Sequence, residues 1–554
     1  MEPKIDAMSL YNRRAINRYE RISVGDLMER VTWSFPDKEA LVGWEGAYAH
    51  KENERLTYKQ GDDKANQFAN GLLEKGLKRG DRVAFYCGNS TEYMLAQLGA
   101  IKAGLVIVPL NTMLAPDLLD YIIKSTEPKS LVVDAELYPR GEKIFKEHRL
   151  KIDVTIPIGG ETIEGSKSFS EFIAGKPANE PDVEIHGDDI VQILYTAGTT
   201  SLPKGAMLSH IYMYMSSIGW ALSNNRGVPT ELDYKMGIFY PVFHIACQGM
   251  TLSALATGGT AVIIRRPDPQ TMVEALSREK LTAIFGNPSD FCQVADTIEQ
   301  NPGKYDTTNL RVVSHGWGAS RPDYDRKFRK LFRQDLVMID NNGQTECVYD
   351  NRFWHHMWYE KYEKNEPVVN YLGVSHPFYA TTIMDDNGNL CPPGVVGEKV
   401  MRSPVMMAGY YKDEESTKQA FRFGWFHGGD ACMHDEEGLL VMVDRYKDII
   451  KSGGENVSSI RVETVLKMHP KVENAAVIGL PHERWLEAVT ACVVTKQGVE
   501  LTEEELIAFC RERAAGYETP KKIVFVEEIP STVGGKMQKY LLREKLKDLY
   551  AGES

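Results

Sequence analysis

The segment YTAGTTSLPKGAMLSH, residues 195–210, carries the residue types that bind phosphate. It holds two glycines, three threonines, two serines and a lysine that directly follows a proline. The backbone N–H groups and hydroxyls of such a loop can converge on an anion, and the lysine adds a positive charge. The segment is not a Walker A loop, because Gly205 and Ala206 follow Lys204 where that motif requires Ser or Thr. A solvated turn after a strand at 190–194 is the alternative interpretation.

Further segments offer partners for a phosphate site. NNGQTE, residues 341–346, places a glycine, a threonine hydroxyl and a carboxylate in one short turn after a predicted strand, where sheet proteins of this kind bind ligands. Glu346 is a reasonable magnesium ligand, because Mg²⁺ prefers few protein oxygens together with phosphate and water. HGGD and DRYKD supply Asp430 and Arg445, a pair suited to a ribose diol. Near the carboxyl terminus, PSTVGGKMQKYLLRE presents Lys536 on a flexible loop before a short helix.

Alternating strands and helices must position these residues. Apolar β-branched runs alternate with segments of helical periodicity, which implies βαβ units and a mostly parallel sheet covered on both faces. Two blocks of this pattern suggest two related α/β subdomains. In the first block we expect strands at 82–86 and 105–109 and helices at 91–103 and 116–125; in the second, strands at 261–265, 283–286, 310–314 and 336–339 and a helix at 271–279.

The character of the sequence changes after Gly373. Short strands separated by Asp-Asn-Gly and Pro-Pro-Gly indicate a small β-rich subdomain. A further mixed α/β block follows the charged stretch 444–448, which is the best candidate for a domain boundary. This block includes a predicted helix at 502–514, whose first glutamates suit the positive end of the helix dipole.

Four motifs in a fixed order resemble those of the adenylate-forming superfamily. They are YTAGTTSLPKG, GWFHGGD, VDRYKDIIKSGGENV and the Gly-Gly-Lys loop near the carboxyl terminus. The superfamily includes acyl-CoA synthetases, the adenylation domains of nonribosomal peptide synthetases, and luciferases. The resemblance extends from PDKEALV at Pro36 to the terminal lysine loop. Each motif alone is weak evidence, whereas the ordered set is specific.

The resemblance implies an α/β fold in two domains. A large N-terminal domain, residues 1–446, would contain two α/β subdomains and a small β-rich subdomain and would bind the acid, ATP and the metal. A small mobile α+β domain, residues 447–554, would carry the catalytic lysine. In the implied reaction a carboxylic acid attacks ATP, giving an acyl-adenylate and pyrophosphate, and CoA then displaces AMP to form acyl-CoA.

The resemblance also assigns roles to the residues that match the family motifs. Lys536 would bridge the α-phosphate and the substrate carboxylate, where negative charge must be neutralised. Thr345 would contact the α-phosphate, and Glu346 would bind Mg²⁺. The remaining nucleotide contacts would come from the phosphate loop, the adenine border and the ribose pair: Thr196, Gly198, Thr199, Thr200, Lys204, Gly318, Ala319, Asn342, Gly343, Asp430 and Arg445.

The acid pocket implied by the family positions contains no cationic side chain. We therefore expect a monocarboxylic acid of modest size, whether aliphatic, alicyclic or aromatic, since nothing would pair a second carboxylate. His244 resembles a gate between this pocket and a thiol tunnel, and a satisfied core histidine is the alternative interpretation. The pocket would be formed by Phe243, His244, Gly286, Asn287, Pro288 and Trp317.

In the family, the C-terminal domain rotates about a hinge, so that one site serves both reactions. The hinge position, the second residue after the ribose arginine, is Lys447 here. After rotation the loop IKSGGENV would face the pocket; it contains Lys451, and Gly453 and Gly454 would leave room for a pantetheine arm. A plain turn is the alternative interpretation of the two glycines.

Several residues depart from the family pattern. Ala197 and Ser201 stand where serine and glycine are usual, and Gly428 replaces a threonine, but none of these changes removes a charge. Asn342 occupies a position where many relatives carry an aromatic ring against adenine, so stacking worth about 1 kcal/mol or more would be lost. Trp317 interrupts a Gly-Gly-Ala pattern, and its ring would face adenine, shorten the acyl pocket or anchor the core.

Composition narrows the partners and the compartment. At 554 residues the chain is too long for a single core, and its net charge of −12 argues against a general nucleic-acid binder. The eight cysteines form no C-x-x-C pair, which favours reduced thiols in the cytoplasm. No apolar run is long enough to span a bilayer. The expected partners are a small carboxylic acid, ATP and CoA, and a homodimer is left open.

Two alternative functions would use the same motifs. An adenylating enzyme could load a carrier protein instead of free CoA. A nucleotide-binding sensor could retain the fold without turnover, as the departures from the family pattern suggest. Retention of Lys536, Glu346, Asp430 and Arg445 argues against a sensor, because a degenerate site would lose charged groups that are costly to bury unpaired.

Overall fold

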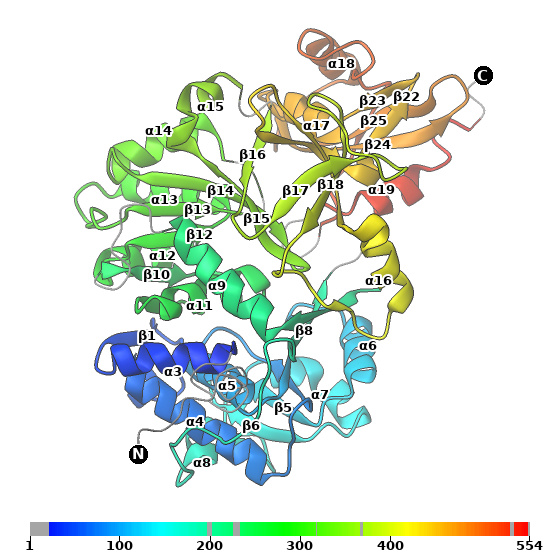
Figure 1. Ribbon diagram of the computed structural model, residues 1–554. Coiled ribbons are helices and arrows are strands. Elements are labelled where there is room, and N and C mark those ends of the chain that lie inside the picture. The colour runs from blue at the N-terminus through cyan, green and yellow to red at the C-terminus, as the bar shows by residue number, and fades with distance from the viewer. Residues whose placement is uncertain are drawn as a thin grey trace, which may run out of the picture.

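The computed structural model describes residues 22–196, 202–224, 233–316, 318, 320–365, 369–531 and 537–551. In this part of the chain, helices flank three β-sheets (Figure 1). Two sheets form the large N-terminal part and the third lies in the smaller C-terminal part. This is the mixed α/β architecture that the alternation of apolar strands and helices predicts.

The first sheet has eight strands in the order β19-β9-β8-β4-β3-β5-β6-β7. Its central strands are parallel, as expected for βαβ units, whereas β8 and β9 form an antiparallel pair. The strands are β3 (Arg82–Tyr86), β4 (Val106–Pro109), β5 (Ser130–Asp134), β6 (Ile152–Ile156), β7 (Lys167–Ser168), β8 (Ile190–Thr196), β9 (Lys204–Ser209) and β19 (Gly409–Tyr410).

The helices beside the first sheet confirm the first predicted block. The predicted helices at 91–103 and 116–125 are α5 and α6, and each ends within one residue of its predicted bound. The helices are α4 (Tyr58–Glu74), α5 (Thr91–Lys102), α6 (Pro116–Thr126), α7 (Tyr138–Glu147) and α8 (Phe169–Ile173).

The second sheet has thirteen strands in the order β17-β18-β20-β21-β16-β15-β14-β13-β12-β10-β11-β1-β2. Strands β1, β11, β10, β12, β13 and β14 run parallel, whereas β2 pairs antiparallel with β1 and all pairs from β14–β15 to β18–β17 are antiparallel. The strands are β1 (Glu39–Gly43), β2 (Arg55–Thr57), β10 (Lys235–Ile238), β11 (Thr260–Ile263), β12 (Ala283–Gly286), β13 (Val312–His315), β14 (Val337–Gln344), β15 (Cys347–Trp354), β16 (Asn370–Ser375), β17 (Ala380–Met384), β18 (Gly397–Arg402), β20 (Phe426–His434) and β21 (Leu440–Arg445).

The helices of the second block also follow the apolar periodicity. The predicted helix at 271–279 is α12, which begins two residues earlier, after the N-cap Asp268. Two further helices of this block are α13 (Pro288–Gln300) and α14 (Pro322–Leu331), and α12 spans Pro269–Arg278. Other helices of the N-terminal part are α3 (Val24–Ser34), α9 (His210–Asn224), α11 (Ile245–Ala256), α15 (Tyr359–Asn365) and α16 (Glu414–Ala420).

Two pairings in the second sheet join segments that are distant in sequence. Strand β1 comes from the amino-terminal region and pairs in parallel with β11, Leu41 opposite Ala261. Its residues 40–43 are buried, as is usual for a strand covered on both faces. The β-rich region predicted after Gly373 is present, but it continues the second sheet, because β16 pairs with β21.

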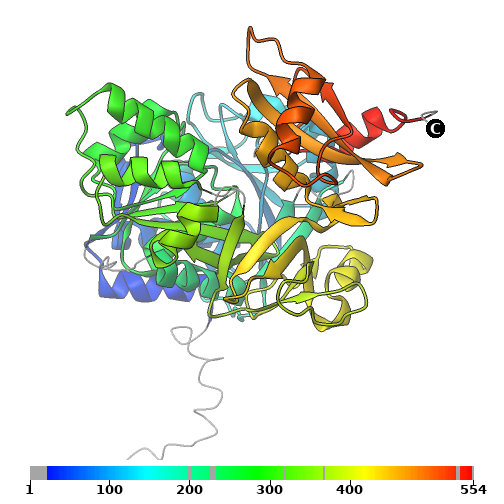
Figure 2. The ribbon, with the colours of Figure 1, turned by 90° about the horizontal axis from the view of Figure 1, so that it is seen from above.

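The third sheet belongs to the C-terminal part and has the order β23-β22-β25-β24, with β26 beside β25. Thr502 caps α18, whose first turn is acidic as predicted. Figure 2 shows these elements together on one side of the molecule, next to the β-rich region. They are β22 (Ile450–Ser452), β23 (Glu455–Val457), β24 (Val472–His482), β25 (Leu486–Thr495), β26 (Lys522–Phe525), α17 (Ser459–Lys467), α18 (Glu503–Arg511) and α19 (Lys539–Leu546).

Candidate active site

Strand β8 and the turn after β14 meet at the carboxylate of Glu346. This side chain is buried, and its Oε1 accepts hydrogen bonds from the hydroxyl of Thr196 at 3.3 Å and from that of Tyr410 at 3.0 Å. Thr196 ends β8, so the structure brings together residues of two expected site segments from different sheets. Burial and the charge of Glu346 hold the pKa of Tyr410 well above its usual range, which keeps Tyr410 a neutral donor.

The ends of the expected phosphate loop lie beside each other. Lys204 begins β9 and is paired with Thr196 in the register of β8 and β9. Its Nζ lies 5.2 Å from the centre of the Tyr410 ring, at the distance of a cation–π contact. Residues 197–201 of this loop, among them Gly198, Thr199 and Thr200, lie outside the described residues.

Thr345 lies in a turn that is held by a buried tyrosine. Strand β14 continues through residues 341–344, which the sequence predicted as part of the turn, so only Thr345 and Glu346 form the turn itself. The Thr345 carbonyl accepts a hydrogen bond from the hydroxyl of Tyr212 at 2.8 Å, and this hydroxyl accepts one from Val348 N at 3.1 Å. Sequence reasoning missed Tyr212, because a tyrosine on an apolar helix is typical of core packing.

Gly343 lies where no side chain fits. A Cβ atom at this position would be 2.4 Å from the backbone N of Tyr349, and the pairing of β14 with β15 shifts register between Asn342 and Gln344. Because the obstructing atom belongs to the backbone, it cannot rotate away. Glycine is therefore required for the close approach of the two strands that carry the turn.

A buried lysine holds the side chain of Asn342. Lys399 Nζ donates to Asn342 Oδ1 and lies 3.1 Å from Asp350 Oδ2 and 3.4 Å from Asp430 Oδ2. Burial opposes the charge of this ammonium, but the two carboxylates hold its pKa above the usual range. Asn342 therefore belongs to a charged cluster. The sequence showed only that Asn342 replaces an aromatic residue, and this did not predict the cluster. The sequence did not predict this role of Lys399, because a lysine in a short strand is usually expected to be exposed to solvent.

Asp430 and Arg445 form the pair that the sequence predicts for a ribose. They face each other in the register of β20 and β21, and Arg445 Nη1 donates to Asp430 Oδ1. The preceding segment is fixed by Glu398, whose Oε1 accepts from Gly429 N at 3.0 Å and whose Oε2 lies 2.7 Å from His427 Nδ1. Asp430 is thus held between Arg445 and the buried Lys399.

The expected acyl-pocket residues lie at the starts of two helices. His244 is the N-cap of α11 and Asn287 is the N-cap of α13, with Pro288 as the first residue of that helix. Burial lowers the pKa of His244 to about 4, so its imidazole is neutral at ordinary pH. Phe243 is half-buried before α11.

Gly286 borders the segment expected to contact adenine. The carbonyl of Gly286 accepts a hydrogen bond from Gly316 N at 3.0 Å, and a Cβ at Gly286 would collide with the ring of Tyr240. Gly318 is exposed, with open space where its Cβ would lie. Trp317 and Ala319 lie outside the described residues, so the direction of the Trp317 ring stays a prediction.

A buried ionic network holds the backbone at Ser320, next to the segment expected to contact adenine. Asp340 Oδ2 accepts from Ser320 N at 3.2 Å, while its Oδ1 lies 3.0 Å from His315 Nδ1 and 3.2 Å from His355 Nε2. Burial disfavours the charged form of His355, but Asp340 and Asp325 outweigh it and raise the pKa of His355 to about 9. An imidazolium thus balances the carboxylate that fixes the loop, an arrangement no sequence motif indicated.

The residues expected to serve CoA lie in the C-terminal part. Gly453 and Gly454 form the turn between β22 and β23 with φ of 62° and 91°, which favours glycine. The backbone N of Gly453 donates to Trp485 O, and that of Lys451 donates to Glu487 Oε2. Exposed Lys447 lies in the turn η5 (Tyr446–Asp448), between β21 and β22. Lys536 lies outside the described residues.

Comparisons with known proteins match almost the whole chain. The sequence model of the AMP-binding enzyme family matches residues 28–411, and that of the AMP-binding enzyme C-terminal domain matches residues 461–536. The 4-hydroxybutyrate–CoA ligase 2 of Metallosphaera sedula is 32% identical, over 94% of this chain and 94% of that protein. A feruloyl-CoA synthase of Amycolatopsis sp is 31% identical, over 92% of this chain and 98% of that protein.

Solved structures share the fold over the same extent. ATP-bound MatB from Rhodopseudomonas palustris aligns with a TM-score of 0.80 and 27% identity, covering 95% of this chain and 99% of that one. The anthranilate CoA ligase AuaEII in complex with anthranoyl-AMP aligns with a TM-score of 0.81 and 25% identity, covering 96% and 98%. In the described part of this chain, no helix is both long and apolar enough to cross a membrane.

Proposed function

The chain belongs to the AMP-binding enzyme family, and we propose that it activates a monocarboxylic acid with ATP and transfers the acyl group to CoA, releasing pyrophosphate and AMP. The observation that carries this proposal is the meeting of Thr196 and Glu346, 3.3 Å apart. The two residues come from motifs 150 residues apart in sequence. Loading of a carrier protein and nucleotide sensing without turnover are not favoured, since curated relatives across the full length are named as CoA ligases or synthetases.

The proposed nucleotide site combines Thr196 with residues of the other motifs. Thr196, Lys204 and Thr345 contact the phosphates, and Asp430 with Arg445 holds the ribose. Gly318, Asn342 and Gly343 border the nucleotide, together with Gly198, Thr199, Thr200 and Ala319. Lys536 approaches from the C-terminal domain and neutralises charge between the α-phosphate and the acid. This division of roles matches the chemistry, because phosphoryl transfer is catalysed mainly by positioning and by charge neutralisation.

Mg²⁺ fits the donor set around Glu346. The buried carboxylate and the neighbouring Thr196 hydroxyl are oxygen donors, and Mg²⁺ commonly takes one or two carboxylates together with phosphate oxygens and water. Glu346 would hold the ion. When bound, the ion would neutralise phosphate charge, and the chain itself would position Glu346 through Tyr410.

The second step is proposed to follow a rotation of residues 447–554 relative to residues 1–446. Lys447 serves as the hinge, and its exposure in a short turn between two sheets supports this role. The turn at Gly453 and Gly454, with Lys451 beside it, then borders the path of CoA. The neutral imidazole of His244 suits a gate between the acyl pocket and the thiol, since moving it displaces no charge.

The acid is proposed to be a monocarboxylate of modest size. The pocket is assigned to Phe243, His244, Gly286, Asn287, Pro288 and Trp317, and no lysine or arginine is among them. The names of the relatives span a small hydroxy acid, an aromatic acid and medium-chain acids, so they agree on the reaction class and differ in the acid.

We place the enzyme in the cytoplasm, which its eight free cysteines support, and propose a homodimer as the assembly to test.

The test is pyrophosphate release from ATP and Mg²⁺ with a panel of aliphatic, alicyclic and aromatic monocarboxylates, each with and without CoA. We expect release that requires an acid and yields acyl-CoA and AMP when CoA is present. Acyl-adenylate that persists despite excess CoA would point to a carrier protein as acceptor. ATP binding without acid-dependent release would support the sensor.

A further inference from the structure

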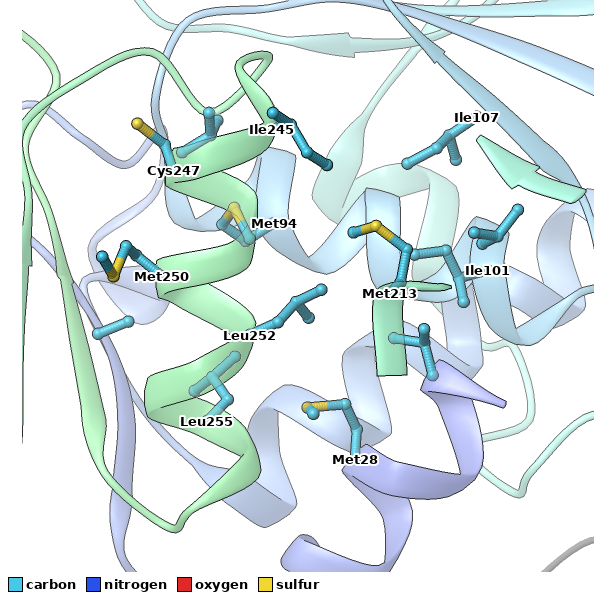
Figure 3. Close-up of a cluster of buried hydrophobic side chains, with 14 of the residues drawn as sticks. Met28, Met94, Ile101, Ile107, Met213, Ile245, Cys247, Met250, Leu252 and Leu255 are labelled. Atoms are coloured by element: carbon cyan, nitrogen blue, oxygen red, sulfur yellow. The ribbon is translucent and has the colours of Figure 1, made fainter. Parts of the chain in front are cut away.

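A small cavity lies in the core between α3, α5, α9 and α11. Its volume is about 40 Å³, and most of its lining is apolar. Figure 3 shows Met28, Met94, Met213 and Leu252 reaching into this interior from the four helices. A water molecule needs about 10–15 Å³ of such volume, so the cavity has room for roughly three heavy atoms.

Two glutamines make this apolar cavity chemically unusual. Gln192 on β8 and Gln248 on α11 both line it, and they are 0% and 3% exposed. Neither the amide nitrogen nor the amide oxygen of either side chain has a hydrogen-bond partner among the described residues. A third lining glutamine, Gln97, differs because its Nε2 donates to Tyr93 OH at 2.7 Å. Leaving a buried amide without a partner is costly, so both amides are available to bind a polar group inside the cavity.

Three elements that carry active-site residues also form this cavity. Strand β8 contains Gln192 and ends at Thr196, four residues further along. Helix α11 contains Gln248 one turn after the proposed gate His244, whose carbonyl accepts from Gln248 N at 3.2 Å. In α9, Met213 lines the cavity, and the preceding Tyr212 holds the Thr345 turn. The cavity therefore shares β8, α9 and α11 with the proposed active site, and Gln248 lies one helical turn from the proposed gate.

We propose that the cavity receives the distal end of the acid, and that Gln192 and Gln248 recognise a hydroxyl group there. The inference rests on the proposed acid–CoA ligase function and specifies its substrate as a short aliphatic monocarboxylic acid with a hydroxyl remote from the carboxylate. A hydroxyl both donates and accepts, so it matches an amide oxygen and an amide nitrogen at once. A second carboxylate would be buried without a cation, and an aromatic ring exceeds the available volume.

The test compares matched acids in the whole enzyme. ω-Hydroxy acids of three to six carbons are each measured beside the alkanoic acid in which a methyl replaces the hydroxyl, with ATP, Mg²⁺ and CoA. We expect kcat/KM to favour the hydroxy acid by roughly tenfold or more at the best chain length, because the alkanoic acid leaves the amides unpaired. In Gln192→Leu and Gln248→Leu, kcat/KM for the hydroxy acid should fall and that for the alkanoic acid should rise.

The matched control is Gln97→Leu, which makes the same change in the same cavity at a glutamine that already has a protein partner. It should lower stability and leave the preference for the hydroxyl intact. Gln192→Met and Gln248→Met provide a second pair if a leucine variant does not fold. Equal or better use of the alkanoic acids, or a preference that survives both glutamine changes, overturns this inference alone. Absence of pyrophosphate release with every acid overturns the proposed function and the inference together.

Discussion

Lys399 Nζ lies 3.4 Å from Oδ2 of Asp430, and neither side chain is more than 4% exposed. The carboxylate proposed to hold the ribose is thus fixed by a buried ammonium on one oxygen and by Arg445 on the other. The same ammonium binds Asp350 and the amide oxygen of Asn342. Nucleotide recognition and folding stability therefore depend on one cluster.

Removing the ammonium should destabilise the protein strongly. In Lys399→Met, two buried carboxylates lose their shared cation, and losing one partner of a buried pair typically costs about 3–5 kcal/mol. We expect a decrease of this size in the free energy of unfolding, measured by urea denaturation. The KM for ATP should also rise, because Asp430 loses one of its two supports.

The double variant Lys399→Met with Asp350→Asn separates charge from packing. It removes the cation together with one of the carboxylates, so it should be more stable than Lys399→Met alone. If Lys399→Met has the same urea denaturation midpoint as the wild type, the cluster does not stabilise the fold.

The His355 network predicts a loss of stability at alkaline pH. The pKa of His355 is about 9 in the folded protein and about 6.5 ordinarily, so the folded state binds the proton more tightly. The stabilisation that the protonated His355 gives the folded state is fully present below pH 6.5 and is lost as the pH rises through 9. The groups that face His355 are Asp340, Asp325 and the buried His315. Burial lowers the pKa of His315, so protonation of His315 affects stability only below pH 6.5.

Urea denaturation midpoints between pH 6.5 and 9 would measure this effect. The wild type should lose stability steadily across that range, and His355→Asn should be less stable at pH 6.5 and show a flatter profile. Cysteine ionisation in the unfolded state affects both proteins alike. Parallel profiles for the two proteins would mean that His355 is not held as a cation.

Local pattern predicted the strands, the helices and the fold class, because apolar periodicity depends on neighbouring residues. The strand at 82–86 and the helix at 116–125 confirm this. The pairing of distant strands could not be predicted in this way, because no residue near β1 indicates that β1 pairs with β11, more than 200 residues later.

The site shows the same division. Residues in known motifs could be assigned by resemblance, and the structure brings Thr196 to Glu346 and Asp430 to Arg445. The lysine that holds Asn342 comes from a strand 57 residues later and carries no motif. Such partners are set by tertiary packing, so a single sequence gives no signal for them.

Lys536→Ala should abolish most of the first step and spare the second. Its ammonium is proposed to neutralise charge that develops at the α-phosphate, and loss of one such group lowers kcat by about 100- to 1000-fold. We expect that loss in acid-dependent pyrophosphate release, with ATP binding measured by calorimetry nearly unchanged. Acyl transfer to CoA from a supplied acyl-adenylate should persist. Equal loss of both steps would indicate a structural role for the lysine.

Glu346→Gln should change the metal requirement of the enzyme. The amide keeps the size of the side chain but loses the negative charge that would attract Mg²⁺, so half-maximal pyrophosphate release should need at least about tenfold more Mg²⁺ at fixed ATP. Tyr410→Phe is the matched control, because it removes a donor to Glu346 and keeps the carboxylate; its Mg²⁺ dependence should shift less than that of Glu346→Gln. An unchanged Mg²⁺ titration in Glu346→Gln, with activity lowered at every concentration, would assign Glu346 to holding Thr196 and Tyr410 in place rather than to binding the ion.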